Sequence, residues 1–415
     1  MKCRFCNTPL QKKFLDLGYA PPSNAYLREE DLWKPEQAFP LRLYVCDNCL
    51  LVQTEDYSRC EELFSKDYAY FSSVSSSFLA HAKSYCDMIT PRLNLNKEKL
   101  VLEIASNDGY LLRNFVEQGI PCIGIEPTAS TAEAAELLGI PVIQDFFGEE
   151  FARLFVSEHN KANLIIGNNV YAHVPDINDF TAGLKNALND EGTITLEFQH
   201  LLSLITLNQF DTVYHEHYSY LSLHIVCRIF EKHGLRVFDV EKISNHGGSL
   251  RIYGCHAEDK RGDNQILHDI LKEEDDAGMN DLQFYLSLQP RANQVKYDMM
   301  LFLIEQFRQG KTVAAYGAAA KANTLFNYAG VKPDLIPFIC DGAKSKQGKF
   351  LPGSHIPIVS ESELINQKPD YIIIIPWNIK QEIMEQLAFT GDWGAKFVIT
   401  MPEFKILEHE NIPHH

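Results

Sequence analysis

Residues 100 to 199 alternate short apolar stretches with helical stretches, and this alternation constrains the fold more than any other feature of the chain. Helices are expected over residues 110–118, 130–138 and 176–188. The apolar stretches predict strands over residues 99–106, 122–126, 141–143, 162–168 and 193–198. Strands that alternate with helices predict an α/β fold with a parallel, doubly wound sheet. Ligands of such a sheet bind at the carboxyl ends of its strands.

Polar residues gather where these strands end. Glu126 closes the second strand, where a carboxylate can accept hydrogen bonds from ribose hydroxyls. No G-x-G-x-x-G pattern follows the first strand, so a pyrophosphate has no obvious seat, whereas small polar residues suit the ribose and amino-acid parts of S-adenosylmethionine. The alternative is a general α/β domain that binds no nucleotide. The candidate cofactor-binding residues are Glu103, Ser106, Asn107, Asp108, Gly109, Glu126, Asp145 and Asn168.

Two imidazoles, a phenol and a carboxylate stand next to one another from Tyr214 to His217. Such a group of side chains can remove a proton, return one and stabilise a developing oxyanion. If the segment were an extended strand, Tyr214 and Glu216 would face one side while His215 and His217 faced the other. We therefore expect an irregular loop that brings Tyr214 and His217 to one substrate.

Two Cys-x-x-Cys pairs occur near the N-terminus. Four thiolates in such pairs fit tetrahedral zinc, and the site should be structural because four protein ligands leave no open position. The alternative is two unrelated thiol pairs. The long gap between the pairs contains Pro21, Pro22 and Pro35, so an irregular loop is expected there. The predicted zinc ligands are Cys3, Cys6, Cys46 and Cys49.

A second α/β unit begins near residue 311, after a charged, helix-favouring stretch that is expected to link two domains. A strand over residues 312–316 leads into the turn Gly317-Ala-Ala-Ala-Lys321 and a helix. The free N–H groups and the dipole of that helix, together with the ammonium of Lys321, would form a seat for an anion. The alternative is a purely structural dimerisation domain. Further strands are expected over residues 336–340, 356–359 and 371–375.

Between these two units, a helix over residues 222–233 and strands over 235–243 and 249–255 would complete a seven-stranded sheet. His246, in the turn between the two strands, and Arg251, in the second strand, are candidates for the substrate site, although a lone histidine in a turn is more often only a turn residue. The predicted domains are a zinc-binding domain over residues 1–65, a methyltransferase-type domain over 66–297 and a Rossmann-like domain over 298–415.

Charge and hydropathy exclude several classes of partner. The formal net charge of −17 argues against nucleic acid, which is bound mainly through Lys and Arg. The apolar runs are too short to span a bilayer, and the first residues lack the apolar core of a signal peptide. The cysteines outside the two pairs stand alone, as in a reducing compartment. We expect a cytoplasmic monomer or small homo-oligomer without a nucleic-acid or membrane partner.

Jointly, these motifs resemble those of the sugar C-methyltransferase family of deoxysugar biosynthesis, over nearly the whole chain. The resemblance implies a zinc-binding domain, a domain for S-adenosylmethionine and a Rossmann-like domain that helps to bind a nucleotide sugar. Glycines that are common in methyltransferases at large are replaced by Ala105 and Asn107, as they are in the family. The motifs are Cys3-x-x-Cys6, Cys46-x-x-Cys49, Glu103-Ile-Ala-Ser-Asn-Asp-Gly109, His173-Val-Pro, Tyr214-His-Glu-His217 and Tyr316-Gly-Ala-Ala-Ala-Lys321.

The resemblance also implies a reaction and its residues. The C3 proton of a nucleoside-diphosphate 4-keto-6-deoxyhexose passes to a base, and the enolate then takes the methyl group of S-adenosylmethionine to give a branched-chain sugar. The implied catalytic residues are Tyr68, His173, Tyr214, Glu216 and His217. The candidate substrate-binding residues are Tyr70, His246, Arg251, Tyr316, Gly317, Lys321, Asn323, Asp341 and Lys346.

Methylation of carbon requires a base and a partner for the enolate oxygen together. We expect His217 to be the base because a neutral imidazole titrates near working pH, whereas Tyr214, the rival, would need a lowered pKa. Glu216 would orient the imidazole or a sugar hydroxyl, Tyr68 or His173 would donate to O4, and the zinc would lie away from the chemistry. The alternatives are an O- or N-methyltransferase acting on another small molecule and a non-catalytic binding or assembly protein on the same scaffold.

Overall fold

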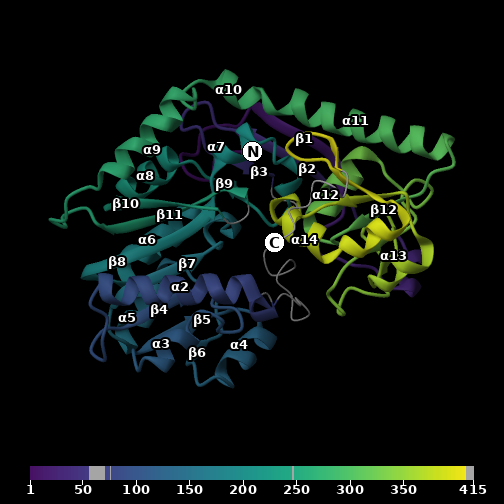
Figure 1. Cartoon of the computed structure of the whole chain (residues 1–415). Coiled ribbons are helices and arrows are strands. Elements are labelled where there is room, and N and C mark those ends of the chain that lie inside the picture. The colour runs from purple at the N-terminus through teal and green to yellow at the C-terminus, as the bar shows by residue number, and fades with distance from the viewer. Residues whose placement is uncertain (56–70, 75, 245–246, 408–415) are drawn as a thin grey trace.

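The structure is a computed structural model that describes residues 1–55, 71–74, 76–244 and 247–407. Within these residues the strands form three sheets, whose strands are labelled in Figure 1. The α/β fold predicted from the sequence is confirmed. Among the described residues, no helix combines the length and the apolar character that crossing a bilayer requires.

The central sheet has seven strands in the order β10-β11-β8-β7-β4-β5-β6. Its strands from β4 to β8 pair in parallel, whereas β11 is antiparallel to both β8 and β10. This is the predicted doubly wound sheet with a closing hairpin. The strands are β4 (Val101–Ile104), β5 (Cys122–Ile125), β6 (Val142–Ile143), β7 (Ala162–Asn168), β8 (Leu188–Gln199), β10 (Leu235–Ile243) and β11 (Ser249–His256).

Helices cover both faces of the central sheet, because successive strand residues point to opposite sides. Leu164 and Ile166 of β7 pack with residues of α2 and α3, whereas Ile165 packs with residues of α5, α6 and α8. Both faces are therefore buried, which accounts for the continuous apolar runs of these strands. The helices are α2 (Ser76–Arg92), α3 (Arg113–Glu117), α4 (Ala129–Glu136), α5 (Glu149–Glu158), α6 (Ile177–Ala187) and α8 (Leu223–Lys232).

The prediction of an irregular loop between the two cysteine pairs is wrong over much of its length, because two strands form there. Lys12–Ala20 form β1 and Phe39–Val45 form β2, which pair antiparallel. Burial alternates along β2, where Leu41, Leu43 and Val45 are buried, and this period of two is typical of a strand with one face on a core. The connection between β1 and β2 is irregular apart from the short 3₁₀ helix η1 (Glu29–Trp33).

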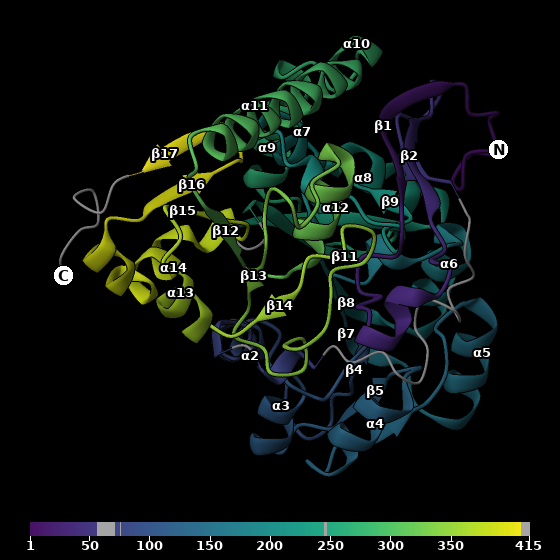
Figure 2. The same cartoon turned by 90° about the vertical axis from the view of Figure 1, so that its right-hand side faces the viewer.

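The N-terminal sheet also contains a strand from the central part of the chain. Its order is β1-β2-β3-β9, with β3 at Val52–Thr54 and β9 at Ser219–Tyr220. Strand β9 follows the Tyr214–His217 segment almost directly, and its pairing with β3 places it beside the N-terminal strands (Figure 2). The segment that carries the two histidines is therefore held between the N-terminal sheet and the central sheet.

The C-terminal sheet has the order β14-β13-β12-β15-β16-β17 and is parallel except for its last pair. Strands β16 and β17 are not among those predicted from the sequence. The strands are β12 (Val313–Tyr316), β13 (Ile339–Cys340), β14 (Ile358–Val359), β15 (Tyr371–Ile374), β16 (Lys396–Ile399) and β17 (Lys405–Leu407). The helices are α12 (Ala320–Ala329), α13 (Ser362–Gln367) and α14 (Lys380–Gln386).

The charged stretch between the two large sheets is helical, as predicted. Helix α11 runs along one side of the molecule in Figure 1, and it contacts both β1 and α12. Met299, Phe302 and Leu303 are buried, whereas Phe307 remains 64% exposed. The predicted boundary between residues 297 and 298 falls inside this continuous helix. The linking helices are α9 (Gln265–Asp276), α10 (Leu282–Leu286) and α11 (Leu288–Arg308).

Candidate active site and zinc site

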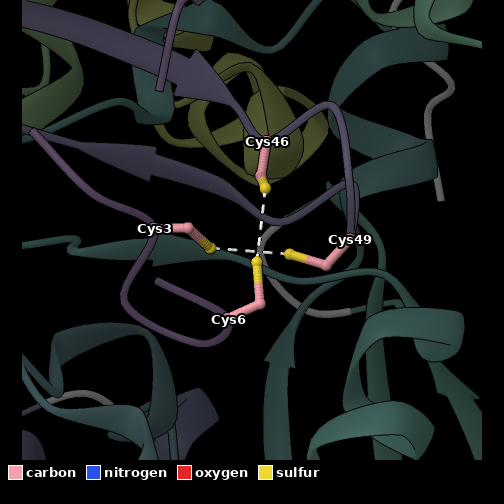
Figure 3. Close-up of side chains that lie close together, drawn as sticks. All are labelled: Cys3, Cys6, Cys46 and Cys49. Carbon is pink, nitrogen blue, oxygen red and sulfur yellow. Dashed lines mark hydrogen bonds between the residues drawn. The ribbon is translucent and has the colours of Figure 1, made fainter. Parts of the chain in front are cut away.

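The four predicted zinc ligands lie together at the edge of the N-terminal sheet, with their sulfur atoms pointing to one centre (Figure 3). All four Sγ atoms lie within 4.8 Å of one another, and Cys3–Cys49 and Cys6–Cys46 are each separated by 3.5 Å. Tetrahedral zinc with Zn–S bonds of about 2.3 Å places its sulfurs about 3.8 Å apart, so the cluster fits zinc. Gln53 Nε2 lies 3.3 Å from Cys3 Sγ and supplies an outer hydrogen bond.

Glu126 lies at the end of β5, as expected for a residue that binds the methyl donor. Its Oε2 accepts the backbone N–H of Asn107 at 2.9 Å, and its Oε1 accepts that of Thr128 at 2.9 Å. These bonds fix the carboxylate at the strand end and hold the loop after β4 against it. Each carboxylate oxygen keeps a second lone pair for a ligand hydroxyl.

Three other candidate cofactor-binding residues, Glu103, Ser106 and Asp108, are buried near the end of β4. Burial and the neighbouring carboxylates of Glu126 and Asp108 raise the pKa of Glu103 well above its ordinary value. A ligand with positive charge would relieve that repulsion, and S-adenosylmethionine carries a sulfonium and an ammonium. The described residues provide no hydrogen-bond partner for four buried oxygens at these strand ends, which belong to Glu103, Ser106, Asp108 and Asn168.

Two of the candidate cofactor residues have a different local role. Asp145 is exposed after β6, and its Oδ1 accepts the N–H of Phe146 at 2.8 Å. Gly109 has a φ of +76°, and a Cβ there would lie 2.4 Å from the side chain of Ile140. Glycine at position 109 is thus required by the turn and by packing under the loop.

The Tyr214–His217 segment is an irregular turn, as expected. The N–H of His217 donates to the carbonyl of Tyr214 at 3.2 Å, and the two side-chain rings lie 4.9 Å apart. The ring of His173, from the loop after β7, lies 4.6 Å from that of His217 at an angle of 79°. We call Tyr214, His217 and His173 the ring cluster. It combines a phenol and two imidazoles above the strand ends of the central sheet.

Hydrogen bonding defines how His173 can act. Its Nδ1 lies 2.8 Å from the carbonyl oxygen of Glu216, and a carbonyl can only accept, so Nδ1 carries the proton. Burial lowers the pKa of His173 to about 4. A neutral His173 with a proton on Nδ1 offers a lone pair at Nε2. It is therefore an acceptor there, which disfavours the donation to O4 that the sequence suggested for it.

The carboxyl of Glu216 occupies a buried position next to the N-terminal sheet's connecting segment. Asn24 Nδ2 donates to Glu216 Oε1 at 2.9 Å. Burial raises the pKa of Glu216 to about 7, although the hydrogen bond from Asn24 opposes the shift. Protonated and ionised forms of this carboxyl are thus both accessible near neutral pH.

Tyr214 and His215 differ from the other members of the segment. Burial, with the nearby carboxylates of Asp211 and Glu216, raises the pKa of Tyr214 well above its ordinary value. A tyrosine base would need the opposite shift. His215 points away to the N-terminal sheet, where its Nε2 lies 3.3 Å from the carbonyl oxygen of Phe39. This contact is consistent with the predicted role of His215 in shaping the loop.

The C-terminal domain binds directly to the chain that precedes the ring cluster, through helix α12 and η6 (Trp377–Ile379). Thr324 Oγ1 donates to the carbonyl of Val213 at 2.8 Å. Trp377 Nε1 donates to Asp211 Oδ2 at 2.8 Å, from one buried side chain to another. Asp211 belongs to η4 (Phe210–Thr212). The ring cluster therefore lies at the junction of the N-terminal, central and C-terminal parts.

The turn that was predicted to bind an anion lies at the start of α12, but some of its backbone N–H groups already have partners. The N–H groups of Gly317 and Ala319 donate to Cys340 and Gly317 carbonyls at 2.7 and 2.8 Å, so the turn offers fewer free donors than expected. The side chain of Lys321 provides a positive charge at this turn, and its Nζ lies 4.2 Å from the ring centre of Trp377. Gly317 has a φ of +95°, and a Cβ there would lie 2.4 Å from Pro376.

The other candidate substrate residues of the C-terminal domain lie around this turn but already have partners. Lys346 Nζ donates to the carbonyl of Ala318 at 3.0 Å and pairs with Asp341 at 3.3 Å. Tyr316 donates its hydroxyl to Glu361 at 2.6 Å. The side-chain amide of Asn323 donates to the carbonyl of Ser23. These contacts connect the turn to the rest of its own domain and to the N-terminal segment.

Arg251 is committed to an ion-pair network inside the central sheet. Its Nε donates to Glu197 at 2.7 Å and its Nη1 to Glu241 at 2.9 Å. His81 of α2 also lies 2.9 Å from Glu197. Three further candidates, Tyr68, Tyr70 and His246, lie outside the residues that the structure describes.

Sequence reasoning missed several residues that contact the site. Asn24 bonds to Glu216, and Trp377 bonds to Asp211 shortly before Tyr214, yet none of Asn24, Asp211 and Trp377 belongs to a recognisable motif. Only Asp211 could have been found from the sequence. It is an acidic residue three positions before Tyr214, and a turn at this place does not require a carboxylate. The partners of Asn24 and Trp377 are far away in the chain, so neither residue has a local signature.

Three family models match successive parts of the chain. A zinc binding domain model matches residues 3–64, a methyltransferase domain model residues 78–240, and a C-methyltransferase C-terminal domain model residues 244–402. C-methyltransferase NovU from Streptomyces niveus is 32% identical over 410 residues, which cover 99% of this chain and 97% of the relative.

The similarity to solved structures is more distant. An S-adenosylmethionine-dependent methyltransferase from Clostridium acetobutylicum ATCC 824 has a TM-score of 0.36 and 12% identity, covering 48% of this chain and 99% of that one. Magnesium protoporphyrin IX methyltransferase from Synechocystis PCC 6803 has a TM-score of 0.35 and 14% identity, covering 43% and 83%. Similarity at this level has no bearing on substrate or reaction.

Proposed function

This chain belongs to the C-methyltransferase family and is an S-adenosylmethionine-dependent enzyme with a zinc-binding domain, and on that premise we propose that it methylates a nucleotide-linked 4-keto sugar. The proposed reaction removes the proton at C3 of a nucleoside-diphosphate 4-keto-6-deoxyhexose, and the enolate is then methylated to a branched-chain sugar. S-adenosylmethionine supplies an electrophilic methyl group when bound. The residues of this chain supply the base and the partner of the enolate oxygen.

The observation that carries this proposal is the ring cluster. His217 lies between the phenol of Tyr214 and the imidazole of His173, with ring separations of 4.9 and 4.6 Å. An oxygen or nitrogen nucleophile needs at most one base, whereas a carbon acid needs a base and an oxyanion partner at the same time. A cluster with one neutral imidazole, one protonated phenol and a second histidine matches the second requirement.

We assign His217 as the base and Tyr214 as the donor to the enolate oxygen. The raised pKa of Tyr214 keeps its phenol protonated, which suits donation and disfavours proton abstraction. His173 would accept a hydrogen bond from the sugar at Nε2, since its Nδ1–H is bound to the carbonyl of Glu216. Glu216 would bind a sugar hydroxyl. Tyr68 keeps its predicted role at O4 as a proposal.

We place the diphosphate of the substrate at the start of α12. Lys321 contributes the positive charge there, and burial lowers its pKa while the nearby Asp211 opposes that shift. A phosphate beside Lys321 would favour the ammonium further. Asn378 holds the same Nζ at 2.7 Å, so the ammonium is oriented before a ligand arrives.

Isotope exchange would test the function. The zinc-loaded enzyme is incubated in D₂O with a nucleoside-diphosphate 4-keto-6-deoxyhexose and S-adenosylhomocysteine, which cannot donate a methyl group. The wild-type enzyme should incorporate deuterium at C3. The His217→Asn variant should not incorporate it, whereas His215→Asn should. Methyl transfer to oxygen or nitrogen without exchange at carbon would instead establish the alternative O- or N-methyltransferase.

The remaining sequence-based expectations stay proposals. We place the enzyme in the cytoplasm as a monomer or small homo-oligomer, with the small-molecule sugar as its partner. The domain ranges 1–65, 66–297 and 298–415 are proposed on the same basis. Size-exclusion chromatography with light scattering would determine the oligomeric state.

A further inference from the structure

The segment of the zinc-binding domain that connects β1 to η1 contacts both the Tyr214–His217 segment and the C-terminal domain. Tyr26 donates its hydroxyl to the carbonyl of Ala318 at 2.7 Å, inside the turn before α12. The N–H of Leu27 donates to the carbonyl of Phe350 at 3.0 Å, and the N–H of Phe350 donates back at 2.8 Å. The segment is thus bonded to the C-terminal domain.

The same segment is bonded to the Tyr214–His217 segment through the side chain of Asn24. Asn24 Nδ2 lies 2.9 Å from Glu216 Oε1, although the two residues are 192 positions apart in the chain. Glu216 is only 9% exposed, whereas Asn24 is exposed. An exposed asparagine contributes little to the packing of a core. Packing therefore does not explain why the amide of Asn24 points to the buried carboxyl of Glu216.

Among the described residues, the side-chain hydrogen-bond partner of the Glu216 carboxyl is Asn24. The titratable side chains that face it are the phenols of Tyr26, Tyr214 and Tyr220, from the connecting segment, the Tyr214–His217 segment and β9. Burial raises the pKa of each phenol, so all three are uncharged near neutral pH. No cationic side chain among the described residues is bonded to the carboxyl of Glu216. Its orientation therefore depends on the amide of Asn24.

We propose that Asn24 of the zinc-binding domain is a positioning residue for the reaction, which holds the Glu216 carboxyl by Oε1 so that Oε2 is presented to the sugar. The proposal rests on the proposed function for the identity of the sugar, but the contact itself does not. An amide suits this task because it donates without titrating or adding charge. The zinc-binding domain then forms a third wall of the substrate site, beside the central and C-terminal domains.

Asn24→Ala is the central variant of the test. It should lower kcat about 10- to 100-fold, the usual worth of a hydrogen bond to a charged group, and leave the affinity for S-adenosylhomocysteine unchanged. Loss of a donor to a carboxylate disfavours the ionised form, so the acid limb of the kcat profile should move to higher pH. Asn24→Gln keeps the amide and should recover part of the rate. An unchanged rate and profile in Asn24→Ala would overturn the proposal.

Two comparisons separate positioning from a general structural effect. Asn280 is also exposed and also donates its amide to a carboxylate, Asp275, at 2.5 Å, so Asn280→Ala is the matched control and should behave as wild type. The double variant Asn24→Ala/Glu216→Gln should be no slower than Glu216→Gln alone, because the amide acts through that carboxyl. Additive losses in the double variant would overturn the proposal as well.

A substrate-free readout distinguishes failure of this inference from failure of the proposed function. Infrared difference spectra of the zinc-loaded protein, recorded between pH 5 and 9 with ¹³C-glutamate labelling, would identify the Glu216 carboxyl band by its loss in Glu216→Gln. In Asn24→Ala that band should titrate at higher pH than in wild type. A shifted band in a protein that does not act on keto sugars would refute only the function. An unshifted band would refute the role of Asn24, whatever the substrate is.

Discussion

Arg4 Nη1 lies 2.9 Å from the carbonyl oxygen of Pro175, two residues beyond His173. Arg4 stands between two cysteines of the zinc site, and its Nη2 donates to the carbonyl of Thr54 at 3.1 Å. The hydroxyl of Thr54 in turn donates to the carbonyl of His217 at 3.2 Å. One zinc-site residue is therefore connected to the backbone beside both histidines of the ring cluster.

Arg4→Ala should lower kcat about tenfold, because each lost hydrogen bond, to Pro175 beside His173 and to Thr54 beside His217, is worth about 1 kcal/mol. The affinity for S-adenosylhomocysteine should not change, since the side-chain hydrogen bonds of Arg4 to described residues go to Pro175 and Thr54 and not to the residues around Glu126. Steady-state kinetics and calorimetry would measure the two effects. Arg28, whose side chain is 73% exposed, provides the control Arg28→Ala. Wild-type kcat in Arg4→Ala would show that the zinc site does not support the histidines through this residue.

The zinc site should be structural. Metal analysis should find one zinc per chain, and Cys46→Ser should lose the metal and lower the unfolding temperature or the yield of soluble protein. Cys227 is a thiol outside the cluster, so Cys227→Ser serves as the control and should keep its zinc. A Cys46→Ser protein that is metal-free, well folded and fully active would contradict the assignment.

The central sheet could be predicted from the sequence because local pattern determines it. Strands β7 and β10 have the predicted bounds, since apolar residues between helical stretches leave few other arrangements. The N-terminal sheet could not be predicted in this way. Register shifts interrupt β1 twice, between Lys13 and Leu15 and between Asp16 and Tyr19, and a bulge hides the period of two.

The site shows the same division between local and distant information. Motif spacing identified the cysteine cluster and the Tyr214–His217 turn, where the functional atoms are neighbours in the chain. The bonds from Asn24 to Glu216 and from Trp377 to Asp211 join residues 192 and 166 positions apart. Such pairs arise only when three domains pack together, so no local pattern records them.

Binding of the methyl donor should depend on Glu126. Removal of its carboxylate in Glu126→Ala should weaken S-adenosylmethionine by about 2 kcal/mol, because ribose hydroxyls lose a charged acceptor. The exposed Glu133 of α4 gives the control Glu133→Ala. Calorimetry with S-adenosylhomocysteine would measure both variants, and equal affinities would place the ribose elsewhere.

Stability should depend on pH through Glu216 and His173, with opposite signs. The pKa of Glu216 is raised from 4.5 to about 7, so its contribution to the free energy of unfolding is complete below pH 4.5 and is lost as the pH rises through 7. The pKa of His173 is lowered from 6.5 to about 4, so its contribution is present above pH 6.5 and is lost as the pH falls through 4. The two slopes oppose each other between pH 4.5 and 6.5.

Glu216→Gln removes one of these slopes. Relative to wild type, its free energy of unfolding should rise by about 2 kcal/mol between pH 4.5 and 6.5, since one pKa unit corresponds to about 1.4 kcal/mol and the carboxyl titrates only partly at the two ends of this range. Urea unfolding at pH 4.5, 5.5 and 6.5 would measure the difference. The same pH dependence in the variant as in wild type would mean that folding does not shift the pKa of Glu216.

The last prediction distinguishes the two possible bases. His217→Asn keeps polarity but cannot take up a proton near neutral pH, so kcat should fall by about two to four orders of magnitude while donor binding stays unchanged. His215→Asn is the matched control, because His215 faces the carbonyl of Phe39, and it should cost much less. Tyr214→Phe should slow methyl transfer by removing the donor to the enolate oxygen, yet still permit exchange at C3. If His217→Asn exchanged the C3 proton at the wild-type rate and Tyr214→Phe did not, the base would be Tyr214.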